Sequence, residues 1–201
     1  MDILIAVLLT AATTVCVRAQ PDGMVHEYLS REEALLEVFP RSANYVEETI
    51  VLDEVQIRQA EETLYRKIAE QTVDVTLCYD EEGRFLGYAV VSDEQGKYRP
   101  ITFVVGVEPD FTVSKVAIMV YREDRGGEVR MPRFLYQYRG KSLDDPLRVN
   151  RDIVNISGAT ISVRAITDGV KKVLFLVTQH FVANPPPAQI PFRNTSDRSE
   201  Q

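Results

Sequence analysis

The stretch 73-VDVTLCYDEEGRFLGYAVV-91 decides the fold, because here apolar residues begin to recur at every second position. Polar and apolar residues alternate over 73–77, an acidic turn ending in glycine follows, and 85–91 returns as the partner strand. Four strands are expected, at 73–77, 85–91, 101–107 and 113–121, with turns at 80–83, 93–96 and 108–110. Consecutive strands joined by short turns pair antiparallel, so the sequence predicts an antiparallel meander.

Helical patterns lie on both sides of this meander. Ser30 and Glu33 have the spacing of a capping box, and Asp53 precedes a second helical pattern as a capping residue. Helices are predicted over 30–39, 54–71 and 162–181, and a further strand over 45–52. Two helices, an antiparallel sheet and a long final helix together predict one α+β domain.

The size and charge of the chain limit its function. It has 201 residues and a formal net charge of −7, which suits a single acidic domain. Nucleic-acid binding needs a basic stripe that faces the phosphates, and the absence of one argues against that function. A small group of basic residues is suited to a single small anion instead: Arg130, Arg133, Arg139 and Lys141.

The two ends of the chain differ in composition from the domain. Residues 3–17 are apolar and precede a leader-type cleavage sequence, so 1–19 are expected to be a signal peptide or an N-terminal anchor. Residues 20–28 are then a linker and 29–183 the domain, followed by a Pro-rich and polar tail at 184–201 that is expected to be disordered. The protein is thus expected to be exported, either periplasmic or at the extracytoplasmic face of the membrane.

Cysteine and histidine indicate neither a disulfide framework nor a metal site. Cys16 lies within the leader, which leaves Cys78 as a lone cysteine in an apolar strand, where a buried structural role is expected. His26 and His180 are far apart in the sequence, and no set of zinc ligands accompanies them.

The segment 156-ISGATIS-162 lies where an apolar run, 153–156, meets the start of the long final helix. The free N–H groups and the positive dipole end of a helix N-terminus favour an anion. Gly158 lets a ligand approach the backbone, Ala159 adds little bulk, and hydroxyls come from Ser157, Thr160 and Ser162. These features suit a phosphate, although the same residues also form ordinary helix caps with nothing bound.

The segment 157-SGATIS-162 resembles the Ser/Thr-Gly-Ala-Thr-x-Ser/Thr signature of the FMN-binding domain family. This family includes flavoprotein subunits of the sodium-pumping NADH:quinone reductase and of the Rnf electron-transport complex. The resemblance implies FMN as the cofactor, attached by a flavin transferase as a phosphoester of Thr160. It covers about residues 28–181, and further similar segments occur in the family order at 28–34, 87–89, 121–123, 127–129 and 137–141.

One position departs from the family pattern. The family has an aspartate six residues before the acceptor threonine, and this chain has Val154 there, followed by Asn155. Beside Thr160, Ser157, Gly158, Ala159 and Ser162, the candidate cofactor residues are Glu123, Arg139 and Lys141, each of which can also be an ordinary surface charge or ion-pair partner. Other candidates, with packing or solvation as their alternative roles, are Arg122, Met131, Tyr136 and Tyr138.

Three functions remain open. The first is an electron-transfer flavoprotein that works with redox partner proteins, membrane-bound ones included, and is not a self-sufficient enzyme. The second is a stand-alone flavin reductase, although the sequence contains no dinucleotide-binding glycine fingerprint. The third is a non-redox exported binding or structural domain that has lost the flavin.

Overall fold

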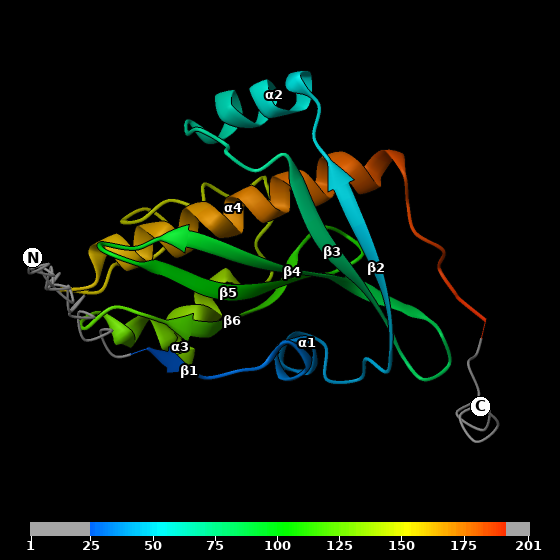
Figure 1. The fold of residues 1–201 in the computed structure, drawn as a ribbon, viewed down its shortest axis with the longest axis horizontal. Coiled ribbons are helices and arrows are strands. Elements are labelled where there is room, and N and C mark those ends of the chain that lie inside the picture. Colours follow the sequence, from blue (N-terminus) through cyan, green and yellow to red (C-terminus); the bar gives the residue numbers. More distant parts are fainter. Residues whose placement is uncertain (1–24, 192–201) are drawn as a thin grey trace, which may run out of the picture.

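A computed structural model describes residues 25–191, and its centre is one six-stranded antiparallel sheet (Figure 1). The strand order is β1-β6-β5-β4-β3-β2. The strands are β1 (His26–Glu27), β2 (Asn44–Val51), β3 (Thr72–Tyr79), β4 (Phe85–Gln95), β5 (Pro100–Val107) and β6 (Val113–Tyr121). The predicted meander is therefore confirmed as β3 to β6, with β2 added at one edge and β1 at the other.

Helices cover both faces of this sheet, which confirms the predicted α+β class (Figure 1). The helical elements are α1 (Arg31–Val38), α2 (Glu54–Leu64), η1 (Gly127–Arg130), α3 (Pro132–Leu135), η2 (Tyr136–Tyr138) and α4 (Thr160–Ala183). Helix α4 packs on β4 and β5, α1 packs on the opposite face against β5 and β6, and α2 contacts α4. None of the helices within residues 25–191 is long and apolar enough to cross a membrane.

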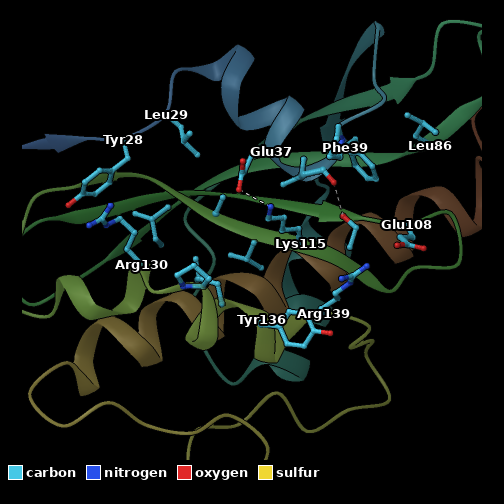
Figure 2. Close-up of a pocket in the computed structure, with 18 of the residues that line it drawn as sticks. Tyr28, Leu29, Glu37, Phe39, Leu86, Glu108, Lys115, Arg130, Tyr136 and Arg139 are labelled. Carbon is cyan, nitrogen blue, oxygen red and sulfur yellow. Dashed lines mark hydrogen bonds and ion pairs between the residues drawn. The ribbon is translucent and has the colours of Figure 1, made fainter.

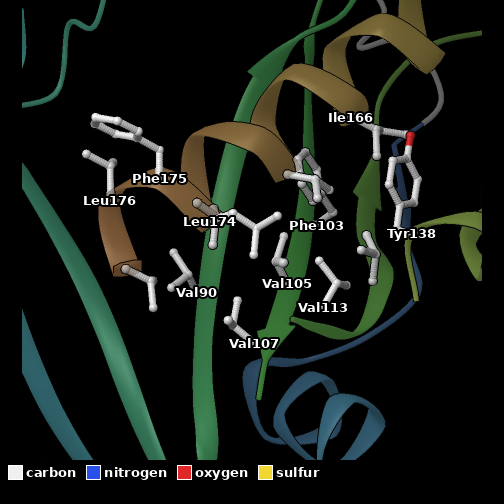
Figure 3. Close-up of a cluster of buried hydrophobic side chains, with 14 of the residues drawn as sticks. Val90, Phe103, Val105, Val107, Val113, Tyr138, Ile166, Leu174, Phe175 and Leu176 are labelled. Atoms are coloured by element: carbon white, nitrogen blue, oxygen red, sulfur yellow. The ribbon is translucent and has the colours of Figure 1, made fainter. Parts of the chain in front are cut away.

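The main hydrophobic core lies between α4 and the sheet (Figure 3). Phe103 and Val105 of β5 meet Ile166 and Leu174 of α4, and all four are completely or almost completely buried. Burial of such side chains stabilises the fold by about 1.5–3 kcal/mol each. The core therefore fixes α4, and with it the start of α4, relative to the sheet.

A second, smaller core lies under α1 and includes Cys78. Burial raises the pKa of this thiol to about 12, so Cys78 stays protonated and unreactive at neutral pH. The sequence prediction of a buried structural cysteine is confirmed.

Several predicted boundaries were wrong. Helix α2 ends at Leu64 instead of 71, because Tyr65 takes a left-handed backbone conformation with φ 54°. Strand β4 continues to Gln95, into the turn predicted at 93–96, and Glu94 within it is buried, with its carboxylate 2.7 Å from Lys172 Nζ. Within the apolar run 153–156, Ile153 forms an isolated bridge to Val149, and the other residues are not in a strand.

The C-terminal segment differs from its prediction over the residues that the structure describes. Residues 184–191, expected to begin a disordered tail, lie against the β3–β4 turn, where Phe85 donates its N–H to the carbonyl of Ala188 and Ile190 donates to Gly83. The leader 1–19 and the tail beyond 191 lie outside the described residues, so those predictions are untested.

Candidate functional site

Helix α4 begins inside the predicted phosphate motif, at Thr160 rather than Ser162. Ala159 is its N-cap residue, and no side chain caps the helix. The first helical hydrogen bond runs from the N–H of Val163 to the carbonyl of Ala159, so the N–H groups of the three residues before Val163 lack an intrahelical acceptor. The first turn carries no acidic residue, which leaves the positive end of the helix dipole without an anion from the helix itself.

The turn that leads into α4 is exposed at Ser157 and Gly158. Gly158 has φ +85°, a conformation that glycine adopts without strain. A Cβ at this position would meet no atom within 4 Å, so open space lies directly against the turn. A ligand phosphate therefore has room to approach the backbone at this point.

The side chain of Asn155 holds the hydroxyl of the predicted acceptor. Asn155 Nδ2 donates to Thr160 Oγ1 at 3.0 Å, and Asn155 Oδ1 accepts the N–H of Ile156 at 2.9 Å. Thr160 is half-buried, so its hydroxyl is not enclosed in the core. Val154, at the position of the family aspartate, is 71% exposed and donates its N–H to Gln137 Oε1.

The Ser162 side chain points into the domain and supports the turn from the interior. It is buried, and its Oγ lies 3.0 Å from Tyr121 Oη. Tyr121 Oη donates to the carbonyl of Arg125 at 2.6 Å, so Ser162 is the donor in the first pair. Gly126 has φ +89° and packs so closely that a Cβ there would lie 2.7 Å from Tyr121 Oη and 3.3 Å from Ala159 Cβ. The loop before η1 is thus locked against the start of α4.

A hollow of about 760 Å³ opens beside this turn. This volume lies in the range of ordinary cofactor pockets. It is lined by Tyr28, residues 124–128, Arg130, Met131, Pro132, Ser157 and Gly158. Thr160 is not among the lining residues but follows two positions after Gly158. Arg125 and Arg130 bring positive charge to this hollow, and Asp124 and Glu128 bring negative charge.

A second hollow of about 950 Å³ lies on the α1 side of the sheet (Figure 2). Tyr28, Arg130 and Pro132 line both hollows, and the Arg130 guanidinium lies 4.4 Å from the centre of the Tyr28 ring. Figure 2 shows this stacked pair at one end of the second hollow, and Leu86 and Glu108 at the other. The Tyr28–Arg130 pair therefore forms part of the wall between the two spaces.

The structure gives several predicted charged residues structural partners away from the motif. Glu123 is buried, and its Oε1 accepts the N–H groups of Tyr98 and Arg99 in the β4–β5 turn. Arg122 bonds to Thr102 Oγ1 and to the carbonyl of Pro100. Neither Glu123 nor Arg122 lines the hollow beside the motif or the one on the α1 side of the sheet.

Lys141 also has a structural partner. Its Nζ lies 2.9 Å from Asp152 Oδ2 and 3.5 Å from Asp145 Oδ1. Partial burial by itself would lower the pKa of Lys141, but the two carboxylates outweigh it and hold the pKa above its ordinary value. Lys141 stabilises the loop before the motif through these ion pairs and lines neither of the two hollows, and its predicted cofactor role stays a prediction.

The remaining candidates divide between the hollows and the core. Met131 lines the hollow beside the motif, and Tyr136 and Arg139 line the second one. Tyr138 is completely buried, with Oη 2.8 Å from Thr167 Oγ1, so it packs in the core. The sequence alone did not predict the contact of Asn155 with Thr160 or the stacking of Tyr28 on Arg130, although Tyr28 lies in a segment that resembles the family.

No cluster of His, Cys, Asp or Glu within residues 25–191 is suited to a metal ion. The site is thus an uncapped helix N-terminus, a glycine-containing turn and an adjoining hollow with aromatic and cationic walls. Such a site is typical of proteins that bind a phosphate-bearing cofactor.

Residues 96–174 match the model of the FMN-binding domain. The match includes β5, β6, the motif and the first part of α4. This match confirms the predicted resemblance to the FMN-binding domain family over these residues, and it supports FMN as the cofactor.

One solved structure supports the fold, and a second has weaker similarity. NqrC of Shewanella oneidensis is similar with 20% identity and a TM-score of 0.52, over 73% of this chain and 85% of that one. The corresponding component of the Na⁺-translocating NADH-quinone reductase from Parabacteroides distasonis has 16% identity and a TM-score of 0.49, over 75% of this chain and 83% of that one. No curated protein sequence matches the chain.

Proposed function

We propose that this chain is an electron-transfer domain whose FMN is attached covalently, through its phosphate, to Thr160. The observation that supports this most directly is the uncapped N-terminus of α4 beside an open hollow. Free N–H groups, the helix dipole and the absence of acidic residues in the first turn all favour a phosphate anion there.

The residues around the hollow would hold the rest of the cofactor. Met131 and Pro132 offer apolar contact to a planar ring, and Tyr28 with Arg130 offers an aromatic face and a cation. FMN supplies one- or two-electron redox chemistry when bound. A cation near the ring stabilises a reduced, anionic flavin, so Arg130 is the residue proposed to raise the reduction potential.

Covalent attachment needs a flavin transferase and a flavin adenine dinucleotide as the donor. Thr160 Oγ1 forms a bond to the FMN phosphorus, the bond from that phosphorus to the adenylate breaks, and AMP leaves. The hydroxyl proton passes to a base of the transferase. No oxidation or reduction occurs in this step.

Intact mass spectrometry after co-expression with a flavin transferase tests the attachment. The wild-type chain is expected to gain one FMN, and Thr160→Ala to gain none. Thr112→Ala is the matched control, because Thr112 is also half-buried but lies in the turn before β6. An unmodified, colourless wild-type chain would remove the proposal and favour a domain that has lost the flavin.

Export and redox partners complete the proposal. The apolar segment 3–17 and the leader-type sequence after it support export to the periplasm or the extracytoplasmic face, where membrane-bound redox proteins are the expected partners. A mature chain that begins near Gln20, or a full-length chain in the membrane fraction, is the expected result of fractionation. Retention of the protein in the cytoplasm would contradict export.

A further inference from the structure

Both ends of the Asn155 side-chain amide are hydrogen-bonded within the motif. Its carbonyl oxygen accepts the N–H of Ile156 at 2.9 Å, so its NH₂ group is the end that faces Thr160 Oγ1 at 3.0 Å. A flipped amide would set NH₂ against the N–H of Ile156, two donors facing each other. The bond to Ile156 therefore fixes which amide end meets the threonine.

This contact has a direct consequence for the Thr160 hydroxyl. A hydroxyl has one proton to donate and two lone pairs to accept with. Because Asn155 occupies one lone pair, the other lone pair and the proton stay available. A donor at the oxygen also favours the form that has lost its proton, since it stabilises the developing negative charge. The Thr160 oxygen is thus held in place, and loss of its proton during attack is made easier.

The side chain of Val154, next to Asn155, cannot form such a hydrogen bond with Thr160. Val154 has an apolar side chain and is 71% exposed, so it offers no hydrogen bond to the hydroxyl. Its backbone N–H is bonded to Gln137 Oε1 at 2.7 Å, which holds the backbone at this position. Within residues 25–191, Asn155 is the side chain seen hydrogen-bonded to Thr160 Oγ1.

We propose that Asn155 is the positioning residue for flavin attachment in this chain, because it orients and polarises the Thr160 hydroxyl for attack on the FMN phosphorus. The inference rests on the proposed covalent function. It differs from a merely structural role in one respect: Asn155 contributes to the rate of attachment and not to the binding of free FMN.

The test measures two quantities in each variant, the rate of FMN attachment from the dinucleotide by the transferase and the affinity for free FMN. Asn155→Ala is expected to slow attachment by between about tenfold and a hundredfold, as expected when a reacting group loses its orientation. Its affinity for free FMN should stay within about twofold of wild type, because the helix N–H groups are unchanged. Val154→Ala, at the adjacent exposed position, is the control and should leave both quantities unchanged.

Asn155→Asp adds a readout that a structural role would not produce. A carboxylate at this position accepts the Thr160 proton instead of donating to the oxygen, so attachment should become pH-dependent and slow as the carboxylate is protonated. Wild-type Asn155 does not titrate.

Three results would contradict the inference. Attachment in Asn155→Ala at the wild-type rate would remove it, and so would equal loss of the rate and of FMN affinity, which would show that the turn had collapsed. The same pH profile in Asn155→Asp as in wild type would also count against it. Failure of the proposed function is a different result, since the wild-type chain itself would then take up no FMN.

Discussion

Helices α2 and α4 begin in opposite ways. At α2, Asp53 Oδ1 accepts the N–H groups of Val55 and Gln56, both at 2.8 Å, and the Gln56 side chain returns a bond to the N–H of Asp53. Glu54 adds a negative charge in the first turn. At α4 no side chain caps the helix and no acid lies in the first turn. The chain caps α2 with its own carboxylate, whereas the first N–H groups of α4 receive no side-chain cap.

This difference does not come from a lack of capping residues at α4. Three hydroxyls lie within the motif, but Ser162 turns inward to Tyr121 and Thr160 bonds to Asn155. Ser157 is exposed on the turn. Helix α1 resembles α2, because Ser30 and Glu33 close its N-terminus with a capping box. The start of α4 is therefore uncapped because none of these hydroxyls accepts a hydrogen bond from its first N–H groups.

The largest expected effect comes from disturbing the packing of Gly126 against the start of α4. Gly126→Ala places a Cβ 2.7 Å from Tyr121 Oη and forces alanine into φ +89°, which should lower the free energy of unfolding by about 2–3 kcal/mol. FMN binding should weaken as well, because Gly126 packs against Ala159 at the start of α4. Urea denaturation and FMN titration measure the two effects.

The next glycine along the chain is the matched control for this prediction. A Cβ on Gly127 would meet nothing within 4 Å, so Gly127→Ala should change the stability by less than about 0.5 kcal/mol. Equal effects of the two substitutions would mean that the packing of the loop on α4 does not support the site.

A smaller effect is expected from removing the N-cap side chain of α2. Asp53→Ala removes the acceptor for two N–H groups of α2 and should cost about 1 kcal/mol of stability. Attachment of FMN should stay at the wild-type level, because α2 lines neither of the two hollows near the motif. Thermal unfolding and intact mass measure the outcome, and Asp53→Ser, which keeps a capping oxygen, is the control. Loss of FMN from Asp53→Ala would show that the two helix starts are not independent.

Much of this contrast could be predicted from the sequence, because caps and turns are local. The capping boxes at Ser30 and Asp53 and the motif before α4 each fall within a few residues of the chain. The strands of the meander were predicted for the same reason, since alternation and turn residues are local signals. Strand β1, with two residues, carries no such pattern and exists because it pairs with β6.

Other features depended on contacts between distant parts of the chain. Glu94 lies in a sequence typical of a turn, but burial beside Lys172 keeps it in β4. The predicted roles of Glu123 and Lys141 rested on their charge and on the segments that resemble the family, and neither reveals the partner of a charged side chain. The Tyr28–Arg130 pair joins two distant segments, so only the folded chain places it beside the motif.

The smallest expected effect tests whether α4 needs an external anion. Ile161 is exposed in the first turn of α4, so Ile161→Glu gives α4 the kind of acidic residue that α2 has in Glu54. The new charge should stabilise the helix by about 0.5 kcal/mol and weaken the binding of free FMN roughly threefold, because the added carboxylate competes with the phosphate for the same dipole. Ile161→Gln is the neutral control, and the difference between the two variants should shrink as salt is added. If Ile161→Glu and Ile161→Gln weaken FMN binding equally at low salt, the phosphate does not lie at the start of α4. The contrast between α4 and α2 would then have no functional meaning.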